Sequence, residues 1–242
     1  MIIHIGKCGG SNLVNKFREI HNLYIISKNE IEKKRDGPTI IKFHCRNAIH
    51  IDKEINNLIK DEDIAILIRD PIKRFISIFF HYYDNYTKGI LDKSYNSIYN
   101  RFKTPNQLAE ALDSDNSDDQ ALALSAFTII THLRFDFNFH LGNNRIKRIY
   151  DSNNKVFIIR QEHYKNDFKL YYKYLTKKFN LKNEFDKFFV DIKNNTNQYN
   201  NLKKLSERAI SNLKKQMISD YRILDELCKY NFISKEYLNS FT

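Results

Sequence analysis

The sequence predicts an α/β fold, in which a parallel sheet is flanked by helices and carries helical elaborations. Short apolar runs alternate with longer segments of helical periodicity, and this alternation is typical of βαβ units. One run, residues 63–68, is almost continuously apolar, as expected for a parallel strand buried on both faces. Because neither an internal repeat nor a linker-like stretch interrupts the 242 residues, we expect a single domain, 1–242, with a helical insertion at roughly 84–150.

The first half of the chain is expected to open with a strand, a glycine turn and a helix. Ile2–Ile5 is a short apolar run that ends at a glycine, and helical periodicity then runs from Leu13 to Ile20. Thr39–Phe43 is the next strand candidate, and Asp63–Ile68 the one after it. A proline that suits a first helical turn follows, so a helix is expected over Ile72–Tyr86.

The second half is expected to be mainly helical around one further strand. Residues 88–119 predict a helical hairpin or lid with a polar loop, because periodic signals are few and acidic residues cluster near its end. The later elements are expected, in order, as a helix at Gln120–Leu141, a strand at Lys155–Ile159, a helix at Glu162–Phe179, an Asn-rich loop at Asp191–Asn201 and an amphipathic helix at Ser206–Cys228 capped by Ser206.

The composition favours a folded chain with an anionic partner. Hydrophobic residues make up 42% and aromatic residues 14%, which argues against disorder. The net charge of +11 favours a nucleotide, a phosphate group, an acidic polysaccharide, nucleic acid or a membrane surface, and does not choose among them. The same charge on a lysine-rich surface also serves solubility alone.

The cysteines and the hydropathy pattern bear on the compartment. Cys8, Cys45 and Cys228 form neither a disulfide framework nor a zinc-binding spacing, so we expect reduced thiols in a cytosol-like compartment. The apolar start of the chain is too short for a signal peptide or a membrane span, so neither is expected.

The segment from His4 to Leu13 has the composition of an anion-binding loop. A glycine turn between a strand and a helix lets backbone N–H groups converge on an anion, and the helix N-terminus adds partial positive charge. Lys7 supplies a full charge and Ser11 a hydroxyl donor. Because this loop lies between a strand and a helix, a P-loop-like parallel sheet is expected. The lysine precedes the glycine pair, unlike the Walker pattern. The alternative is a tight turn with an exposed lysine.

A second phosphate-binding element is expected after the strand at 63–68. Arg69 leaves the end of that strand, and Ser77 lies about two turns into the following helix. A planar guanidinium binds phosphate oxygens in a bidentate manner, and a hydroxyl completes the shell. Asp70 is expected to cap the helix, whereas Arg74 is left open between a structural role and a phosphate contact. The alternative for Arg69 and Ser77 is a surface ion pair and an ordinary helix serine.

These two elements resemble those of a known family. The run from His4 to Ser11 resembles the opening HIPKTGGTS of sulfotransferases that use 3'-phosphoadenosine-5'-phosphosulfate (PAPS), especially the uronyl and heparan 2-O-sulfotransferase branch. Residues 69–77 resemble the family's RDPxxRxxS element, whose Arg and Ser bind the nucleotide 3'-phosphate. Gly6 stands where the family has proline, and Cys8 where it has threonine, which removes one hydroxyl donor. The resemblance implies PAPS as co-substrate without a metal, bound by Lys7, Cys8, Gly9, Gly10, Ser11, Asn12, Arg69, Ser77, Lys193 and Thr196.

The resemblance continues to the end of the chain. The 160–167 segment resembles the family's R-x-E…D turn, where Glu162 and Asp167 are expected to pack and cap. Residues 193–196 resemble its KNxT loop, which can close over the nucleotide. The run that begins at Asp220 resembles the closing DYxLY helix, with a packing role.

A histidine is the expected base. His44 follows the strand Thr39–Phe43 at the carboxyl edge of the sheet, and it resembles the catalytic histidine of the 2-O-sulfotransferases. His81 and His132 are the fallbacks. With Lys7, His44 is the expected catalytic residue, and the implied reaction is in-line transfer of a sulfuryl group to an acceptor hydroxyl, on a carbohydrate or glycoconjugate.

Other readings stay open. A P-loop-like nucleotide-binding kinase lacks its Walker lysine here, and a non-catalytic glycan-binding relative would keep the fold without the reaction. A nucleic-acid partner is not expected, because the lysines of 165–178 fall on the solvated face of an amphipathic helix. A complete chain is expected to be cytoplasmic, and a trimmed catalytic domain to belong in the Golgi lumen.

Overall fold

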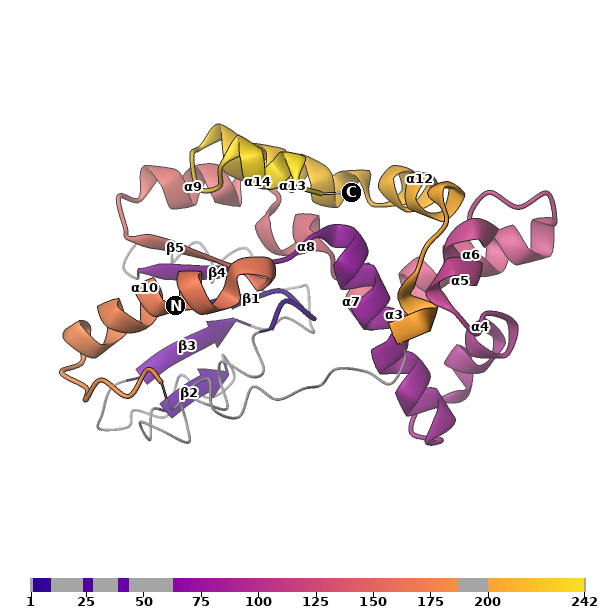
Figure 1. Ribbon diagram of the computed structural model, residues 1–242, viewed down its shortest axis with the longest axis horizontal. Coiled ribbons are helices and arrows are strands. Elements are labelled where there is room, and N and C mark those ends of the chain that lie inside the picture. Colours follow the sequence, from indigo (N-terminus) through magenta and orange to yellow (C-terminus); the bar gives the residue numbers. More distant parts are fainter. Residues whose placement is uncertain (1, 10–23, 28–38, 44–62, 187–199, 242) are drawn as a thin grey trace.

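The computed structural model describes residues 2–9, 24–27, 39–43, 63–186 and 200–241. The chain forms a parallel sheet with helices against it and a lobe of helices beside it (Figure 1). The structure therefore confirms the expected α/β class with a parallel sheet flanked by helices. No helix within the described ranges is long and apolar enough to cross a membrane.

The sheet has five parallel strands in the order β2-β3-β1-β4-β5. The strands are β1 Ile2–His4, β2 Tyr24–Ser27, β3 Thr39–Phe43, β4 Ile64–Ile68 and β5 Val156–Arg160. Every side chain of β4 is fully buried, as the continuous apolar run predicts for a central parallel strand. The strands expected near residues 2–5, 39–43, 63–68 and 155–159 are all present.

One strand was not expected from the sequence. β2 is the four-residue edge strand YIIS, and it pairs with β3 alone. Four residues without apolar alternation give little indication of a strand, so the extended conformation of β2 depends on its pairing with β3. Thr39–Phe43, the second strand candidate of the sequence, is therefore third in chain order, and it pairs directly with β1.

The first run of helices builds most of the lobe. α3 follows β4 directly, and its N-cap is Asp70, whose carboxylate accepts from the N–H groups of Ile72 at 2.7 Å and Lys73 at 3.3 Å. The helices up to β5 are α3 Pro71–Thr87, η3 Lys93–Tyr95, α4 Asn96–Arg101, α5 Pro105–Ala111, α6 Ser117–Ile129, α7 Thr131–Arg134, α8 Phe137–Leu141 and α9 Arg145–Asp151.

The later helices return to both parts of the molecule. They are η4 Gln161–His163, α10 Tyr164–Lys178, η5 Asn200–Lys203, α12 Glu207–Gln216, α13 Ile218–Lys229 and α14 Lys235–Asn239. α12 packs on α5 and α3 in the lobe, whereas α10 packs on β5 and α13 on α8. Figure 1 shows α9, α13 and α14 along one side of the sheet. The segment 84–150 is helical as expected, but α8 and α9 belong to the core of the sheet rather than to the lobe.

Two expected helices are broken. Gln120–Leu141 is divided into α6, α7 and α8, because Ile130 has an extended backbone (ψ 106°) and the side chain of Asp136 caps a new start. Ser206–Cys228 is divided at Met217, whose ψ of 27° ends α12. The break at Met217 lets α12 pack on α5 and α3 of the lobe, while α13 packs on α8 and joins the core cluster of the sheet. Ser206 caps α12 as expected, by accepting from the N–H of Ala209 at 3.1 Å.

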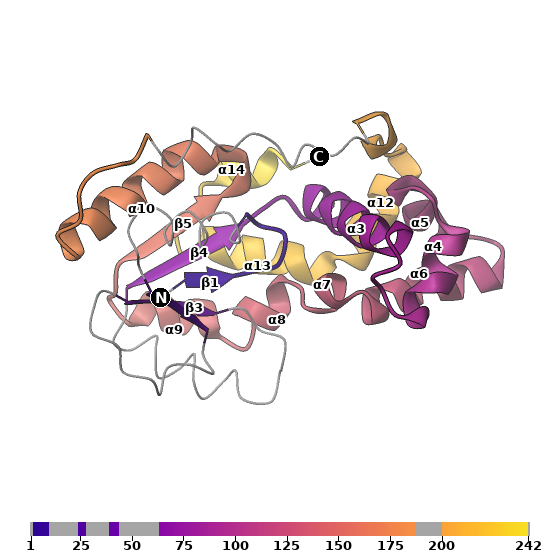
Figure 2. The ribbon, with the colours of Figure 1, turned by 90° about the horizontal axis from the view of Figure 1, so that it is seen from below.

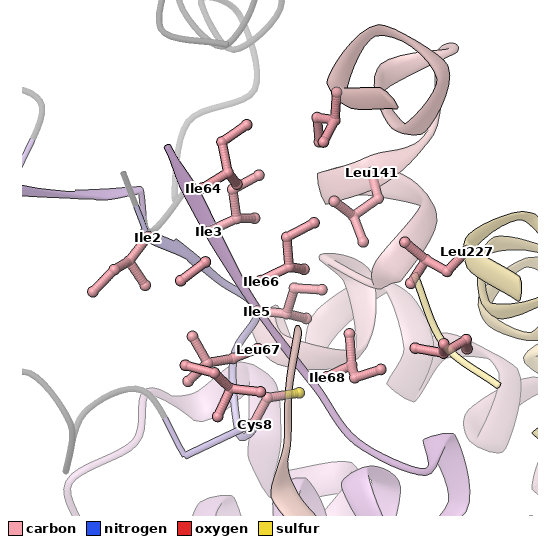
Figure 3. Close-up of a cluster of buried hydrophobic side chains, with 14 of the residues drawn as sticks. Ile2, Ile3, Ile5, Cys8, Ile64, Ile66, Leu67, Ile68, Leu141 and Leu227 are labelled. Atoms are coloured by element: carbon pink, nitrogen blue, oxygen red, sulfur yellow. The ribbon is translucent and has the colours of Figure 1, made fainter. Parts of the chain in front are cut away.

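The core of the sheet extends into the loop after β1. Ile5 and Cys8 are fully buried in the same cluster as Leu67 and Ile68 of β4 (Figure 3). These two buried side chains therefore hold the backbone of the loop against the core of the sheet. Cys8 and Cys228, the two described cysteines, are free.

Candidate functional site

The strand order identifies the point of the sheet where a ligand site is expected, between the carboxyl ends of β1 and β4, and we call this point the crevice. The chain leaves β1 towards β2 on one side, whereas it leaves β4 towards β5 on the other. Ligands of open α/β sheets bind where such connections diverge, at the carboxyl ends of the strands. The loop after β1 and Arg69 after β4 meet at this point, and Figure 2 shows the loop curving beside the start of α3.

The loop holds an unusual backbone. Lys7 has a φ of 66° and Gly9 a φ of 89°, both in the left-handed region. A left-handed conformation costs a residue with a Cβ about 1–3 kcal/mol, so the surrounding contacts must hold Lys7 in place. The N–H of Cys8 donates to the carbonyl of Ile5 at 3.2 Å and closes the turn.

Cys8 is placed as a core residue. Its side chain is fully buried, and burial raises the pKa of its thiol to about 12. With the thiol in the core and the N–H engaged in the turn, neither group faces the crevice. The sequence expects Cys8 among the cofactor-binding residues, whereas its position makes it an anchor of the loop.

Lys7 and Arg69 bring two positive charges together. The Nη1 of Arg69 donates to the carbonyl of Lys7 at 3.2 Å, and its Nε is buried without a hydrogen-bond partner among the described residues. Burial and the nearby guanidinium lower the pKa of Lys7, whereas Asp84 acts in the opposite direction. Two partly desolvated cations at one point are stabilised by an anion between them.

One face of α3 looks towards this pair. Ser77, His81 and Asp84 are separated by four and three positions, so they share one face of the helix. The ring of His81 contacts that of His132 at a centroid distance of 5.9 Å, and His132 packs on Gly6, so this face lies beside the loop. Besides burial, the charge of Lys7 accordingly lowers the pKa of His81, and that of Asp84 acts to raise the pKa of both residues. Ser77 is half-buried and shares this face by its spacing.

His132 of α7 closes the other side of the loop. A Cβ built on Gly6 would lie 2.0 Å from Cδ2 of His132, so the imidazole occupies the space that a larger residue would need. The Nδ1 of His132 is 2.8 Å from the hydroxyl of Tyr82. This contact explains why glycine stands where the resembling family has proline.

Gln161 is a residue that the sequence analysis did not select. It follows β5, and its Oε1 would lie 2.0 Å from a Cβ on Gly9. That oxygen is buried and has no hydrogen-bond partner in the described part of the chain. The signal that could have found it is its position directly after a strand of a parallel sheet, at the same edge as Lys7 and Arg69.

Arg74 has a structural role. Its side chain is 1% exposed, its Nε donates to the carbonyl of Gly6 at 3.0 Å, and its Nη2 donates to the carbonyls of His132 at 2.5 Å and Phe135 at 3.0 Å. Its Nη1 is 3.6 Å from the carboxylate of Asp220. Arg74 thus connects the loop to α7 and α13. Of the two roles left open for it, a structural one and a phosphate contact, the structure favours the structural role.

The carboxylates near β5 also pack and cap, as expected. Glu162 accepts from the N–H of Asp70 at 3.1 Å and from the hydroxyl of Tyr237 at 2.8 Å. Asp167 forms a bidentate pair with Arg160 at 2.7 Å for both bonds. Asp220 is buried against Arg74, which agrees with the packing role expected for the 220–224 run.

The remaining predicted site residues lie outside the described ranges. They are Gly10, Ser11, Asn12, His44, Lys193 and Thr196. Within the described ranges, the structure brings Lys7, Gly9 and Arg69 together at the ends of β1 and β4, and it places Ser77 in the second turn of α3, half-buried. Those ranges contain no cluster of three or more His, Cys, Asp or Glu residues that could hold a metal ion.

The comparisons with known proteins return no relative. No family model matches the chain, and neither the curated proteins nor the solved structures include a significant match.

Proposed function

We propose that this protein is a sulfotransferase that moves a sulfuryl group from PAPS to an acceptor hydroxyl, on a carbohydrate or glycoconjugate. The observation that carries the proposal is the hydrogen bond between Arg69 and the backbone of Lys7, which sets two cations at the divergence of β1 and β4. A P-loop-like site is supported by the same geometry, because the glycine loop follows the central strand and α3 follows its neighbour.

The two cations suit the two ends of a nucleotide that carries phosphates on both its 3' and 5' positions. Lys7 would neutralise the 5'-phosphosulfate, where negative charge grows on the bridging oxygen as the S–O bond breaks. Arg69 and Ser77 would bind the 3'-phosphate, the guanidinium through two N–H groups and the hydroxyl through one. A nucleotide with only one phosphate position filled would offer a single anion to both cations and would therefore bind less tightly.

The acceptor side is proposed from charge and chemistry. The net charge of +11 favours a polar or anionic acceptor, such as an acidic oligosaccharide, over a lipophilic phenol. The attacking hydroxyl needs a base, since its pKa is far above neutrality. The sequence expects His44 in this role.

Titration calorimetry with 3'-phosphoadenosine-5'-phosphate, the product nucleotide, tests the proposal most directly. We expect it to bind at least tenfold more tightly than AMP or ADP, because a charge-assisted contact contributes about 1.5–3 kcal/mol. Equal affinity for the three nucleotides would contradict the proposal, and ADP binding that requires Mg²⁺ would favour the kinase alternative. Transfer of label from PAPS to acidic oligosaccharides, with simple phenols as the comparison, then tests the acceptor class.

A further inference from the structure

The described histidines differ in what holds their rings. They are His4, His81, His132, His140 and His163. His4 and His140 are buried, at 3% and 2% exposure, so neither can meet a substrate. His163 is exposed on η4, where its ring contacts Tyr237 of α14 at a centroid distance of 5.9 Å. The two that remain, His81 and His132, lie together beside the loop, with ring centroids 5.9 Å apart.

His132 is committed to packing. Its Nδ1 is bonded to the hydroxyl of Tyr82, and its opposite edge, which carries Cδ2 and Nε2, lies against Gly6. Moreover, its own carbonyl accepts from the buried guanidinium of Arg74. Its ring and backbone are therefore both held by the protein, which suits a support of the loop.

His81 has the opposite situation. It is half-buried, neither of its ring nitrogens is hydrogen-bonded to another residue of the described ranges, and it sits on the α3 face that looks towards Lys7. The groups that face it are Lys7 from the loop, Asp84 and Tyr82 from α3, and His132 from α7. Burial, and then the charge of Lys7, lower the pKa of His81, while Asp84 opposes them. The imidazole is thus neutral at pH 7 and keeps a lone pair for a proton.

We propose that His81 accepts the proton of the attacking hydroxyl, in the role that the sequence expects for His44; this inference rests on the proposed sulfotransferase function. As the new O–S bond forms, the bond from sulfur to the bridging oxygen of the 5'-phosphate breaks, and its electron pair leaves with the nucleotide. The hydroxyl proton passes to His81. Asp84, almost one turn further along α3, stabilises the imidazolium that results.

The test compares His81→Gln and His81→Ala with the wild type in three measurements. Calorimetry with 3'-phosphoadenosine-5'-phosphate should give affinities within about threefold of each other, because His81 does not hold the nucleotide. The rate of sulfate transfer at saturating PAPS should fall about 10²–10⁴-fold in both variants. The wild-type rate should fall about tenfold per pH unit below the pKa of the base, since a protonated imidazole cannot accept a proton, and this acidic limb should vanish in both variants. Added imidazole should restore part of the rate in His81→Ala alone.

Matched variants distinguish the loss of the base from a general loss of activity. His163→Gln removes an exposed imidazole whose ring contacts Tyr237 of α14, and it should keep both the rate and the acidic limb. Retention of the acidic limb in His81→Gln, or its disappearance in His44→Gln instead, would overturn the assignment. If the wild type transfers sulfate normally and His81→Gln does too, the base is elsewhere while the proposed function stands. If the wild type does not bind the bisphosphate nucleotide, the proposed function fails and the base assignment falls with it.

Discussion

Gly6→Ala measures how tightly the loop after β1 is held by α7. The added methyl carbon would lie 2.0 Å from Cδ2 and 2.9 Å from Nε2 of His132. The ring cannot swing away cheaply, because Tyr82 holds its Nδ1 and Arg74 holds its backbone carbonyl. Gly6 is not among the residues with positive φ, so the cost is steric and not a backbone penalty.

The expected loss of stability is that of an overpacked core site, about 1–3 kcal/mol. For a chain of this length, each kcal/mol corresponds to a change of about 2–4 °C in Tm, so the melting temperature should fall by about 2–12 °C. Thermal and urea unfolding of the same samples give both quantities. We also expect weaker binding of the bisphosphate nucleotide, because the loop that carries Lys7 must shift to admit the methyl group.

A double-mutant cycle with His132→Ala isolates the contact. His132→Ala alone should cost about 0.5–1.5 kcal/mol for the hydrogen bond to Tyr82, together with the loss of packing. In that background, Gly6→Ala should be nearly neutral, so the two changes should couple by about 1–3 kcal/mol. If Gly6→Ala costs the same with and without the imidazole, the packing of His132 against the loop is not what requires glycine there.

Three further changes test the charges of the crevice. Arg69→Ala should remove most of the preference for the 3'-phosphorylated nucleotide, at a cost of about 1.5–3 kcal/mol in calorimetry, and it should weaken the binding of AMP much less, because AMP lacks the 3'-phosphate. Lys7→Ala should lower the single-turnover rate of sulfate transfer more than nucleotide affinity, because the charge it stabilises grows in the transition state; a loss confined to binding would refute that role. Arg74→Met should cost about 3–5 kcal/mol in urea unfolding by leaving Asp220 buried without its counter-ion, and Arg74→Met with Asp220→Asn should recover a good part of that loss. A surface-like effect of Arg74→Met, below about 0.5 kcal/mol, would contradict the structural role assigned to it.

Where one local signal decides an element, the sequence was sufficient. β4 is a run of five apolar residues ended by Arg69, and a strand of that kind can only be satisfied between two others in a parallel sheet. Asp70 and the proline after it specify the start of α3 through a side-chain cap and a preset φ. Ser206 specifies the start of α12 through the same kind of side-chain cap.

Where contacts with distant parts of the chain decide the bounds of an element, the sequence alone did not predict them. The periodicity from Ser206 to Cys228 is continuous, yet the helix breaks at Met217, because one half packs on the lobe and the other joins the core cluster of the sheet. β2 is likewise a strand only through its pairing with β3. Such outcomes depend on partners far away in the chain, and no window of neighbouring residues contains them.

The candidate site divides along the same line. By itself the sequence determined that Lys7 and the glycines follow the first strand, that Arg69 ends a later strand, and that Ser77 lies about two turns into the helix after it, since these are matters of spacing. Only the tertiary structure decided that β4 lies beside β1, which brings Arg69 onto the backbone of Lys7, and that Cys8 turns into the core. It also decided that His132 supports Gly6 while His81 faces Lys7. The sequence does not distinguish these two histidines, and packing alone separates them, because the ring of His132 is held between the hydroxyl of Tyr82 and the backbone of Gly6.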